Sequence, residues 1–325
     1  MSRSVAIVTV TWNSSPFIGE VINALLNQSL LPQRFIVVDN GSSDAEATAK
    51  LVAGFPGAEW IPLLSNRGVA YANNLGIAQC SDVEFVALLN PDAFPQPTWL
   101  ESLVTATDAH PGAAAFGSRQ LCQGRPSILD GIGDHYHFSG LVWRGGFGEA
   151  QRDEHLVASE IFSPCSAAAL YRRKNLMEVL GFDDDYFCYV DDVDVGFRLR
   201  LAGHSAVYVP DAVVHHVGSA SSGGRRSDFA TYHGHRNLVW TFVTNMPGTL
   251  FWLLLPFHVL LNIVSLFAIT ARGQGRVIFR AKWHAILGLP SAWAKRKDLQ
   301  AKRVASIREI WRVLDKRLLP MRNGR

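Results

Sequence analysis

Apolar and polar residues alternate in blocks along the first ninety residues. Short runs rich in Val, Ile and Leu cover residues 5–10, 35–38, 60–64 and 85–89. Such uninterrupted apolar runs are typical of strands buried on both faces of a parallel sheet. Between them, apolar residues recur at helical spacing over residues 17–30, 45–53 and 69–79. Strands that alternate with helices predict an α/β fold, with a doubly wound and mostly parallel central sheet.

Three of these strands run directly into polar side chains. Asp39 follows the second strand, Asn66 the third and Asp92 the fourth. In open α/β sheets ligands bind at the carboxyl ends of the strands, so the three side chains together predict a nucleotide or phosphate site. Taken alone, each is more typical of a turn or a helix cap. The chain has no G-x-G-x-x-G sequence and no Walker lysine, which argues against a dinucleotide fold and a P-loop.

The segment Asn90-Pro91-Asp92 ends the strand at residues 85–89. Pro91 and Pro95 stiffen this loop, and a carboxylate held at a strand end could bind a hard cation and, through it, a phosphate. The alternative is that Asn-Pro-Asp only turns the chain.

Residues 117–160 carry no regular pattern and are rich in Gly, His and aromatic residues. A long irregular loop inside an α/β domain is often functional, so this segment is expected to face the substrate or to pack against the domain. Its three histidines lie near aspartates, but their spacing fits no specific metal.

A second acidic stretch begins a helix predicted over residues 191–202. Asp191 and Asp192 follow an aromatic run that includes Tyr186, Phe187 and Tyr189. Carboxylates next to each other and next to apolar rings tend to have a raised pKa, which suits a general base that takes a proton from a hydroxyl. Acidic residues at a helix start also suit the helix dipole, which accounts for one or two of them without any catalytic role.

Two adjacent histidines, His215 and His216, follow a short strand predicted at residues 206–209. One of them could complete the ligand set of a metal bound by Asp92. A His-His pair after a strand is more often structural.

The C-terminal part differs in kind. Residues 237–271 contain no Asp, Glu, Lys or Arg, and residues 249–270 are long and apolar enough to span a bilayer. From Arg272 onward there are 15 Lys or Arg against 3 Asp or Glu, whereas the preceding residues are acidic overall. A single crossing would place this basic tail opposite a cytosolic domain, against the positive-inside tendency.

A re-entrant or in-plane hydrophobic hairpin therefore fits better, followed by basic amphipathic helices over residues 276–289 and 299–319 that lie on anionic lipid. The alternative is a buried helical subdomain. The basic C-terminal segment contains no sequence that resembles a nucleic-acid recognition motif. We expect residues 1–220 to form the α/β domain and residues 221–325 a helical membrane-associating region. The four scattered cysteines and the lack of a signal peptide favour a reduced cytosolic setting.

Taken together, these stretches resemble the inverting family 2 glycosyltransferases with a GT-A fold, in particular the rhamnosyltransferase-like branch. The resemblance covers residues 5 to about 220 and is carried by Val8-Thr9-Val10-Thr11-Trp12-Asn13-Ser14, Val38-Asp39-Asn40-Gly41-Ser42, Asn66-Arg67-Gly68 through Asn73-Asn74-Leu75-Gly76, Asn90-Pro91-Asp92, Leu170-Tyr171-Arg172-Arg173, Tyr189-Val190-Asp191-Asp192-Val193-Asp194 and His215-His216. Arg236-Asn237 before a hydrophobic stretch also looks like members that act at the membrane.

The resemblance implies a role for each matching residue. Thr11, Trp12, Asp39 and Asn66 would hold the base and ribose, and the wider donor site would include Gly68, Asn74, Asn90 and Arg198. Asp92 and His215 would bind Mg²⁺ or Mn²⁺, which bridges the diphosphate. Asp192 would be the catalytic base. Asn90 stands where the family's D-x-D motif has its first aspartate, and Asp191 replaces the usual Glu, which leaves Asp191 as a second candidate base.

The expected activity is transfer of a sugar, L-rhamnose from dTDP-L-rhamnose, to a hydroxyl of a lipid-linked or cell-surface glycan. Another donor, such as UDP-galactofuranose or UDP-GlcNAc, is the alternative within the family. The expected location is the cytoplasmic face of the plasma membrane. A glycoside hydrolase also uses paired carboxylates, but nucleotide loops at strand ends argue against it. A non-catalytic nucleotide-binding membrane protein is a third class, which would bind nucleotide without turnover.

Overall fold

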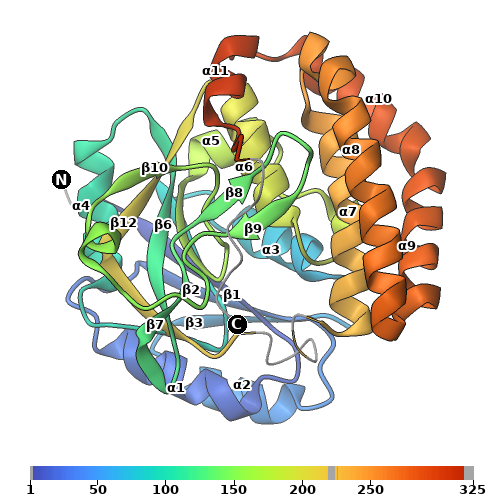
Figure 1. Cartoon of the computed structure of the whole chain (residues 1–325). Coiled ribbons are helices and arrows are strands. Elements are labelled where there is room, and N and C mark those ends of the chain that lie inside the picture. Colours follow the sequence, from blue (N-terminus) through green and yellow to red (C-terminus); the bar gives the residue numbers. More distant parts are fainter. Residues whose placement is uncertain (1–2, 219–223, 225, 318–325) are drawn as a thin grey trace.

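The computed structural model describes residues 3–218, 224 and 226–317 (Figure 1). A sheet of ten strands forms its centre, in the order β10-β12-β6-β11-β4-β1-β2-β3, with β5 paired to β12 and β7 paired to β6. Four neighbouring strands are parallel, namely β1 (Val5–Thr11), β2 (Arg34–Asp39), β3 (Ala58–Pro62) and β4 (Phe85–Leu89), and β6 and β12 form a further parallel pair. The predicted α/β fold with a mostly parallel central sheet is therefore confirmed.

Both faces of the sheet are covered, which explains the uninterrupted apolar runs. In β1, Ile7 packs into a core with α1 (Ser15–Leu26) and α4 (Trp99–Ala109), whereas Val8 packs on the opposite side with α3 (Val69–Ala78). Successive strand residues point to opposite faces, so a strand buried on both sides needs apolar residues at every position. The remaining helices of this domain are α2 (Ala45–Val52), α5 (Arg173–Glu178) and α6 (Asp191–Leu201), with short 3₁₀ turns η1 (Asp153–Leu156) and η2 (Asp184–Tyr186).

Residues 117–160 are not the irregular loop that the sequence predicted. They continue β6 (Ala113–Cys122) and form β7 (Arg125–Gly131), β8 (Asp134–Tyr136), β9 (Val142–Arg144) and most of β10 (Ser159–Ile161). β8 and β9 pair with each other as a separate two-stranded sheet. These strands are short, and their glycines weaken any alternation of polar and apolar residues, so periodicity alone does not find them.

Two further strands add antiparallel pairs to the sheet. β11 (Ala168–Arg172) runs antiparallel between β4 and β6, and β5 (Ala93–Pro95) is antiparallel to β12. β12 (Ser205–His216) is much longer than the predicted strand at residues 206–209. Pro210 and Asp211 look like a strand end in the sequence, but a register shift between Val209 and Val213 absorbs them, and pairing continues to His216. The two histidines thus end the strand instead of following it.

The C-terminal helices lie beside the sheet domain as a bundle (Figure 1). α7 (Asp228–Asn245) packs against α9 (Gly275–Leu287) and α10 (Leu289–Ala301). α8 (Gly248–Ile269) is one uninterrupted helix that contains Pro256, so the predicted chain reversal comes after the apolar stretch. It comes at the π-turn η3 (Thr270–Gln274), where Gly273 has φ 88°. The helix predicted over residues 299–319 is instead the end of α10 followed by α11 (Ile307–Val313).

The bundle shares a hydrophobic core with the sheet domain. Phe197 of α6 and Tyr136 of β8 pack in one cluster with Phe242, Phe251 and Ile310 of the C-terminal helices. Within the described residues, Gly248–Leu287 is the only helical stretch long and apolar enough to cross a membrane, and 22% of its most apolar window is buried. The expected domain boundary at residues 220/221 lies outside the described residues.

Candidate active site

The carboxyl ends of β1 and β2 bring the first predicted site residues together. Thr11 and Asp39 are paired in register, and the Thr11 hydroxyl donates to Asp39 Oδ1 over 3.1 Å. The backbone N–H of Ser42 donates to Asp39 Oδ2 over 3.0 Å. Asp39 is buried, whereas Trp12, the first residue after β1, is exposed. This arrangement leaves a fixed carboxylate and an exposed indole at the sheet edge, as the sequence predicted for a nucleotide site.

The loop between β3 and α3 completes this edge. Asn66 Oδ1 accepts hydrogen bonds from Asn40 Nδ2 (3.0 Å) and from the Gly68 N–H (2.9 Å), so the two loops hold each other. Gly68 has φ 88°, and a Cβ there would lie 2.6 Å from the carbonyl oxygen of Phe187. Only glycine allows this close approach to the loop that precedes α6.

Asp92 lies in contact with a histidine, but it is His216 and not His215. His216 Nε2 lies 3.3 Å from Asp92 Oδ1, whereas His215 Nε2 lies 3.3 Å from Gln96 Nε2. Neighbouring residues of a strand point to opposite faces, so only one of the two histidines can face Asp92. The prediction of His215 as the partner of Asp92 is corrected to His216.

The residues around His216 fit a divalent cation. His216 Nδ1 is 2.8 Å from Asp130 Oδ2, and the buried Nε2 has only the Asp92 carboxylate beside it, without a hydrogen bond of good geometry among the described residues. In metal-binding histidines, one ring nitrogen typically bonds to a carboxylate and the other ring nitrogen faces the metal. Burial disfavours a charge on this ring, but Asp130 and Asp92 together raise the pKa of His216 to about 9, so a cation must displace a proton.

Two protein ligands do not make a closed metal site. In the part of the chain that the structure describes, no group of three or more His, Cys, Asp or Glu side chains is close enough to hold a metal ion. Asp92 and His216 would therefore share the cation with oxygens from another molecule, as a phosphate-bridging cation requires.

The second acidic pair begins α6. Asp192 accepts hydrogen bonds from the backbone N–H groups of Ser166 (3.3 Å) and Val193 (2.9 Å), and its side chain is half-buried. Burial, and then the charge of Asp192, raises the pKa of Asp191 to about 8. Burial also raises the pKa of Asp192, against the nearby positive charge of Arg144. Both carboxyl groups thus have the raised pKa expected of a general base near neutral pH.

Asn90 lies between these two clusters. It ends β4, and its backbone N–H donates to the carbonyl oxygen of Ala167 over 2.8 Å, next to the Ser166 that contacts Asp192. Its half-buried position is compatible with a place near the donor.

Two residues predicted to bind the donor, Asn74 and Arg198, instead form hydrogen bonds within the fold. The Asn74 amide donates to the carbonyl of Phe182 (2.7 Å) and to Asp184 Oδ1 (2.8 Å), and its oxygen accepts from the Phe182 N–H. Arg198 is buried, and its guanidinium donates to Asp194 and to the carbonyls of Val179 and Gly181. Both side chains tie α3 or α6 to the segment at residues 179–184, so neither points to a diphosphate.

The pair formed by Asp194 and Arg198 gives a prediction for stability. Asp194 also accepts hydrogen bonds from Tyr186 Oη (3.1 Å) and Asn245 Nδ2 (2.7 Å). Replacing Asp194 with Asn leaves Arg198 as a buried charge without its partner, and we expect a loss of about 3–5 kcal/mol in the free energy of unfolding, measured by urea denaturation. The exposed ion pair of Glu46 and Lys50 supplies the control, because Glu46→Gln should leave the urea midpoint unchanged. Equal midpoints for the two variants would contradict a structural role for Asp194.

Arg144 is a site residue that the sequence did not single out. From the end of β9, its guanidinium donates to Asp130 Oδ2 (2.7 Å) and to the Cys165 sulfur (2.6 Å), and its charge reaches Asp192. It therefore links the Asp130–His216–Asp92 cluster to the acidic pair. Gly131 leaves the space for it, since a Cβ there would lie 2.2 Å from Arg144 Cδ. An arginine between an aromatic residue and a glycine has no sequence pattern that would mark Arg144 as a site residue. Only the glycine at position 131 indicates that another group comes close to the backbone there.

Comparison with known proteins agrees with this geometry. The sequence model of "Glycosyl transferase family 2" matches residues 6–180. An N-acetylglucosaminyl-diphospho-decaprenol L-rhamnosyltransferase of Mycobacterium tuberculosis is 30% identical over 259 residues, which cover 72% of this chain and 82% of that protein. An O-antigen chain rhamnosyltransferase of Salmonella typhimurium is 25% identical and covers 65% of this chain and 66% of its own length.

The fold is also found among solved structures. A mannosyltransferase of Pyrobaculum calidifontis, solved with GDP-Man and Mn²⁺, superposes with a TM-score of 0.55 over 96% of this chain and 88% of its own, at 17% identity. Its likeness confirms the GT-A architecture. The family model covers more than half of the chain, and the mycobacterial relative matches most of its length. The chain is thus a glycosyltransferase with a GT-A fold and belongs to glycosyl transferase family 2, where its relatives include rhamnosyltransferases.

Proposed function

We propose that this enzyme transfers L-rhamnose from dTDP-L-rhamnose to a hydroxyl group of a lipid-linked glycan, with inversion at the anomeric carbon. The names of the mycobacterial and Salmonella relatives support the sugar, and the mycobacterial name supports a lipid-diphosphate acceptor. The observation that carries the proposal is Arg144, which contacts Asp130 behind His216 and whose charge reaches Asp192. Arg144 thus connects the cluster that would hold the cation with the acidic pair whose pKa is raised.

The chemistry follows from these side chains. Asp192 accepts the proton of the acceptor hydroxyl as the hydroxyl oxygen attacks the anomeric carbon. The bond between that carbon and the phosphate oxygen breaks, and the nucleoside diphosphate leaves with both electrons. Mg²⁺ or Mn²⁺ held by Asp92 and His216 would supply positive charge for the leaving diphosphate. Thr11, Trp12, Asp39 and Asn66 hold the nucleoside, so the sugar points toward Asp192.

A donor panel tests this proposal. Thermal stabilisation and acceptor-dependent release of nucleoside diphosphate are measured with dTDP-L-rhamnose, UDP-galactofuranose, UDP-GlcNAc and GDP-mannose, each with and without Mn²⁺. We expect turnover only with dTDP-L-rhamnose and a polyprenyl-diphosphate-linked acceptor. Turnover with another donor would retain the glycosyltransferase and replace the sugar, and nucleotide binding without turnover for every donor would contradict catalysis.

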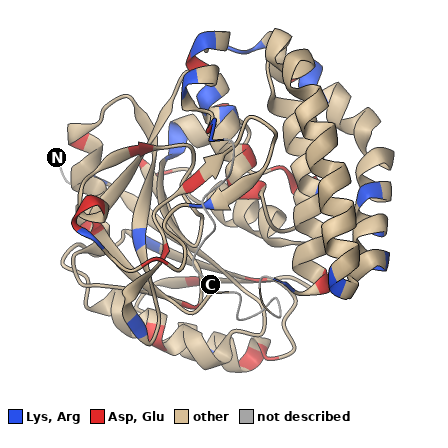
Figure 2. Cartoon of the chain, viewed as in Figure 1, with Lys and Arg blue, Asp and Glu red and all other residues tan. Residues whose placement is uncertain are grey.

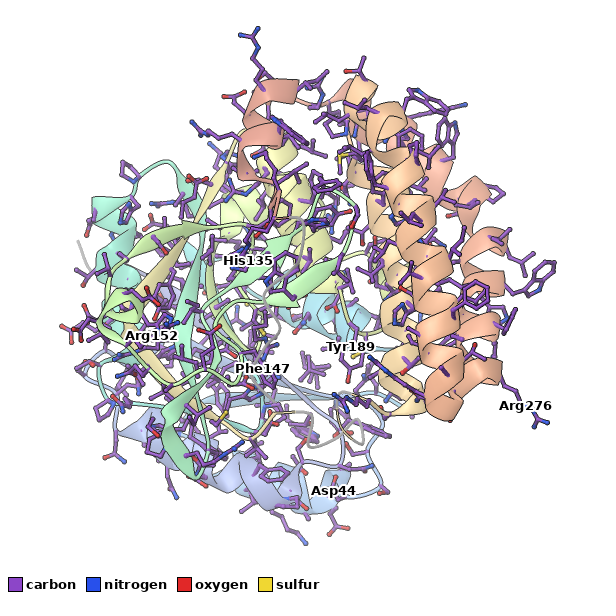
Figure 3. All side chains as sticks on the ribbon, viewed as in Figure 1. Asp44, His135, Phe147, Arg152, Tyr189 and Arg276 are labelled. Carbon is purple, nitrogen blue, oxygen red and sulfur yellow. The ribbon has the colours of Figure 1, made fainter. Side chains whose placement is uncertain are left out.

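The outer surface of the helical bundle is suited to a membrane. Large apolar side chains are exposed along α8 and α9, namely Trp252, Leu253, Phe257, Leu260, Val264, Phe267, Phe279, Trp283 and Ile286. α8 carries no charged residue, whereas α9 to α11 carry many Lys and Arg residues (Figure 2). Arg276 extends outward from the start of α9 (Figure 3). An apolar face flanked by cations is the pattern of a helix that lies on anionic lipid. We propose that the bundle binds the cytoplasmic face of the plasma membrane, as a peripheral or re-entrant segment.

Binding to liposomes tests this surface. We expect the protein to bind vesicles that contain phosphatidylglycerol at least about tenfold more tightly than neutral phosphatidylcholine vesicles, since juxtamembrane cations are attracted to anionic lipid. Replacing Phe267 and Trp283, which are 70% and 59% exposed, with Glu should weaken binding to both kinds of vesicle, and more strongly to the anionic one, because Glu removes apolar surface and adds negative charge. Val157, 63% exposed on the sheet domain, provides the matched control as Val157→Glu. Equal binding of the double variant and the control would contradict the assignment.

A further inference from the structure

The loop that leads into the acidic pair has an unusual backbone. Phe187, Tyr189 and Val190 have φ of 65°, 66° and 67°. Such angles are uncommon for residues other than glycine, and Val190 is β-branched, for which they are least favourable. Residues held in this way persist only when their surroundings impose the conformation, and they concentrate at functional sites. Asp191 and Asp192 follow directly, so the direction in which their side chains point depends on this loop.

The loop is held from outside by one amide. Asn237 of α7 is fully buried, and its Nδ2 lies 3.0 Å from the carbonyl oxygen of Tyr186, 2.9 Å from that of Cys188 and 2.7 Å from that of Tyr189. An amide nitrogen has two hydrogens, so it reaches three carbonyls only by sharing them. A loop whose carbonyls converge on a single donor group loses several contacts at once when that group is removed.

Arg236 reinforces the same contact. Its Nη2 donates to the carbonyl oxygens of Asp185 and Tyr186, each over 2.9 Å, and its Nε donates to Asn237 Oδ1 over 2.9 Å. The last hydrogen bond sets which end of the Asn237 amide faces the loop. Arg236 and Asn237 together thus hold four backbone carbonyls between residues 185 and 189.

The bundle fixes α7, which carries this pair. Trp240 Nε1 donates to the carbonyl of Ala285 over 3.0 Å, and Lys282 Nζ donates to that of His235 over 2.9 Å, so α9 is attached on both sides of Asn237. Tyr189 lies between the sheet domain and α7 (Figure 3), with its ring 6.1 Å from that of Phe229. The strained loop is therefore positioned by the C-terminal helices in addition to its own domain, in which the Val69 N–H donates to the carbonyl of Phe187 over 2.6 Å.

We infer that Asn237, oriented by Arg236, is a positioning residue for glycosyl transfer: it holds residues 186–190 in the conformation that directs the α6 carboxylates at the acceptor hydroxyl. This inference rests on the role proposed above for Asp192. It gives the C-terminal helices a part in catalysis in addition to any contact with lipid.

The test replaces Asn237 with Asp, which keeps the size but puts oxygen where the shared donor lies. We expect kcat to fall about 10–100-fold, because small displacements of a reacting group have effects of this size. KM for the donor should stay within twofold. The acid limb of the kcat profile should move from its wild-type position, since the surroundings of the two carboxyl groups change. Hydrogen exchange of the backbone amides at residues 186–192 should accelerate.

A matched control lies on the same helix. Thr244 is buried and its hydroxyl contacts the carbonyl of Ala292, not the loop, so Thr244→Val should lower thermal stability without changing kcat, the pH profile or exchange at residues 186–192. Arg236→Met is the second variant if Asn237→Asp does not fold, because it removes the donors and keeps an apolar stem over the Trp240 ring.

Unchanged hydrogen exchange at residues 186–192 in the folded Asn237 or Arg236 variant would overturn the inference. Faster exchange would also overturn it if kcat and the pH profile of the variant equalled those of Thr244→Val. Hydrogen exchange needs no substrate, so it tests the contact on the loop even if the wild-type protein transfers none of the sugars offered. A wild-type protein that transfers none of the sugars would contradict the proposed function, but it would not contradict the role of Asn237 in holding the loop.

Discussion

Replacing Asp192 with Asn is expected to lower kcat for glycosyl transfer by about 10²–10⁴-fold, the usual contribution of a general base, while nucleotide binding stays unchanged. Asn keeps the shape but has a single acceptor oxygen, so it retains only one of the two hydrogen bonds from the N–H groups of Ser166 and Val193, and it cannot take a proton. The measurement is single-turnover transfer together with calorimetric binding of the nucleoside diphosphate.

The wild-type pH profile should show the same base. Burial raises the pKa of Asp192 above the usual aspartate range, so activity should be full above the raised pKa and fall as the pH decreases through it, at a higher pH than for an exposed aspartate. The profile is recorded at saturating metal and donor so that loss of binding does not imitate it.

Asp191→Asn decides between the two candidate bases. If Asp192 is the base, this variant should retain most of its activity, and its acid limb should move to lower pH because a neighbouring negative charge has been removed. A larger loss of kcat in Asp191→Asn than in Asp192→Asn would transfer the role of base to Asp191.

Replacing His216 with Ala is expected to abolish activation by Mg²⁺ or Mn²⁺ at ordinary metal concentrations, with at least about a 100-fold loss of kcat/KM. The reason is geometric, since of the two histidines only His216 faces Asp92, with its buried Nε2 3.3 Å from Asp92 Oδ1. The readout is the Mn²⁺ concentration needed for half-maximal transfer, together with nucleoside diphosphate affinity with and without the metal.

His215→Ala provides the matched control, because the two residues are adjacent and differ only in the face of β12 on which they lie. It should leave the metal dependence unchanged. Asp130→Asn should weaken metal activation by about 10–100-fold, as expected when the carboxylate behind a metal-binding histidine is removed. Loss of metal activation in His215→Ala with retention in His216→Ala would return the assignment to His215.

The sequence was sufficient for the site residues that follow directly from strand ends. A buried parallel strand needs apolar residues at every position, so its end is visible as a change to polar residues, and Asp39, Asn66 and Asp92 were found in the polar segments that begin there. The two α6 carboxylates were visible because two adjacent charges follow an aromatic run. These signals are local, and the structure places all five residues where the pattern predicted.

Arg198 and His215 show where local patterns mislead. Arg198, two turns into a helix with an acidic start, was expected to belong to the donor site, but α6 is buried on all sides after its first turn, and Arg198 pairs with Asp194 inside. For the histidines, the register shift between Val209 and Val213 changes which residues face the site, so counting along the strand cannot choose between neighbours.

By itself, the sequence determined the α/β class, the polar segments at the strand ends, the acidic pair, the family and the apolar helix with its basic flanks. All of these depend on residues close together in the chain. Only the tertiary structure decided that His216 and Asp130 lie behind Asp92, that Arg144 connects the two clusters and that Asn237 holds the loop before Asp191. Each of these contacts joins segments dozens of residues apart, and the hydrogen bonds concerned need directions and distances that a linear pattern does not contain.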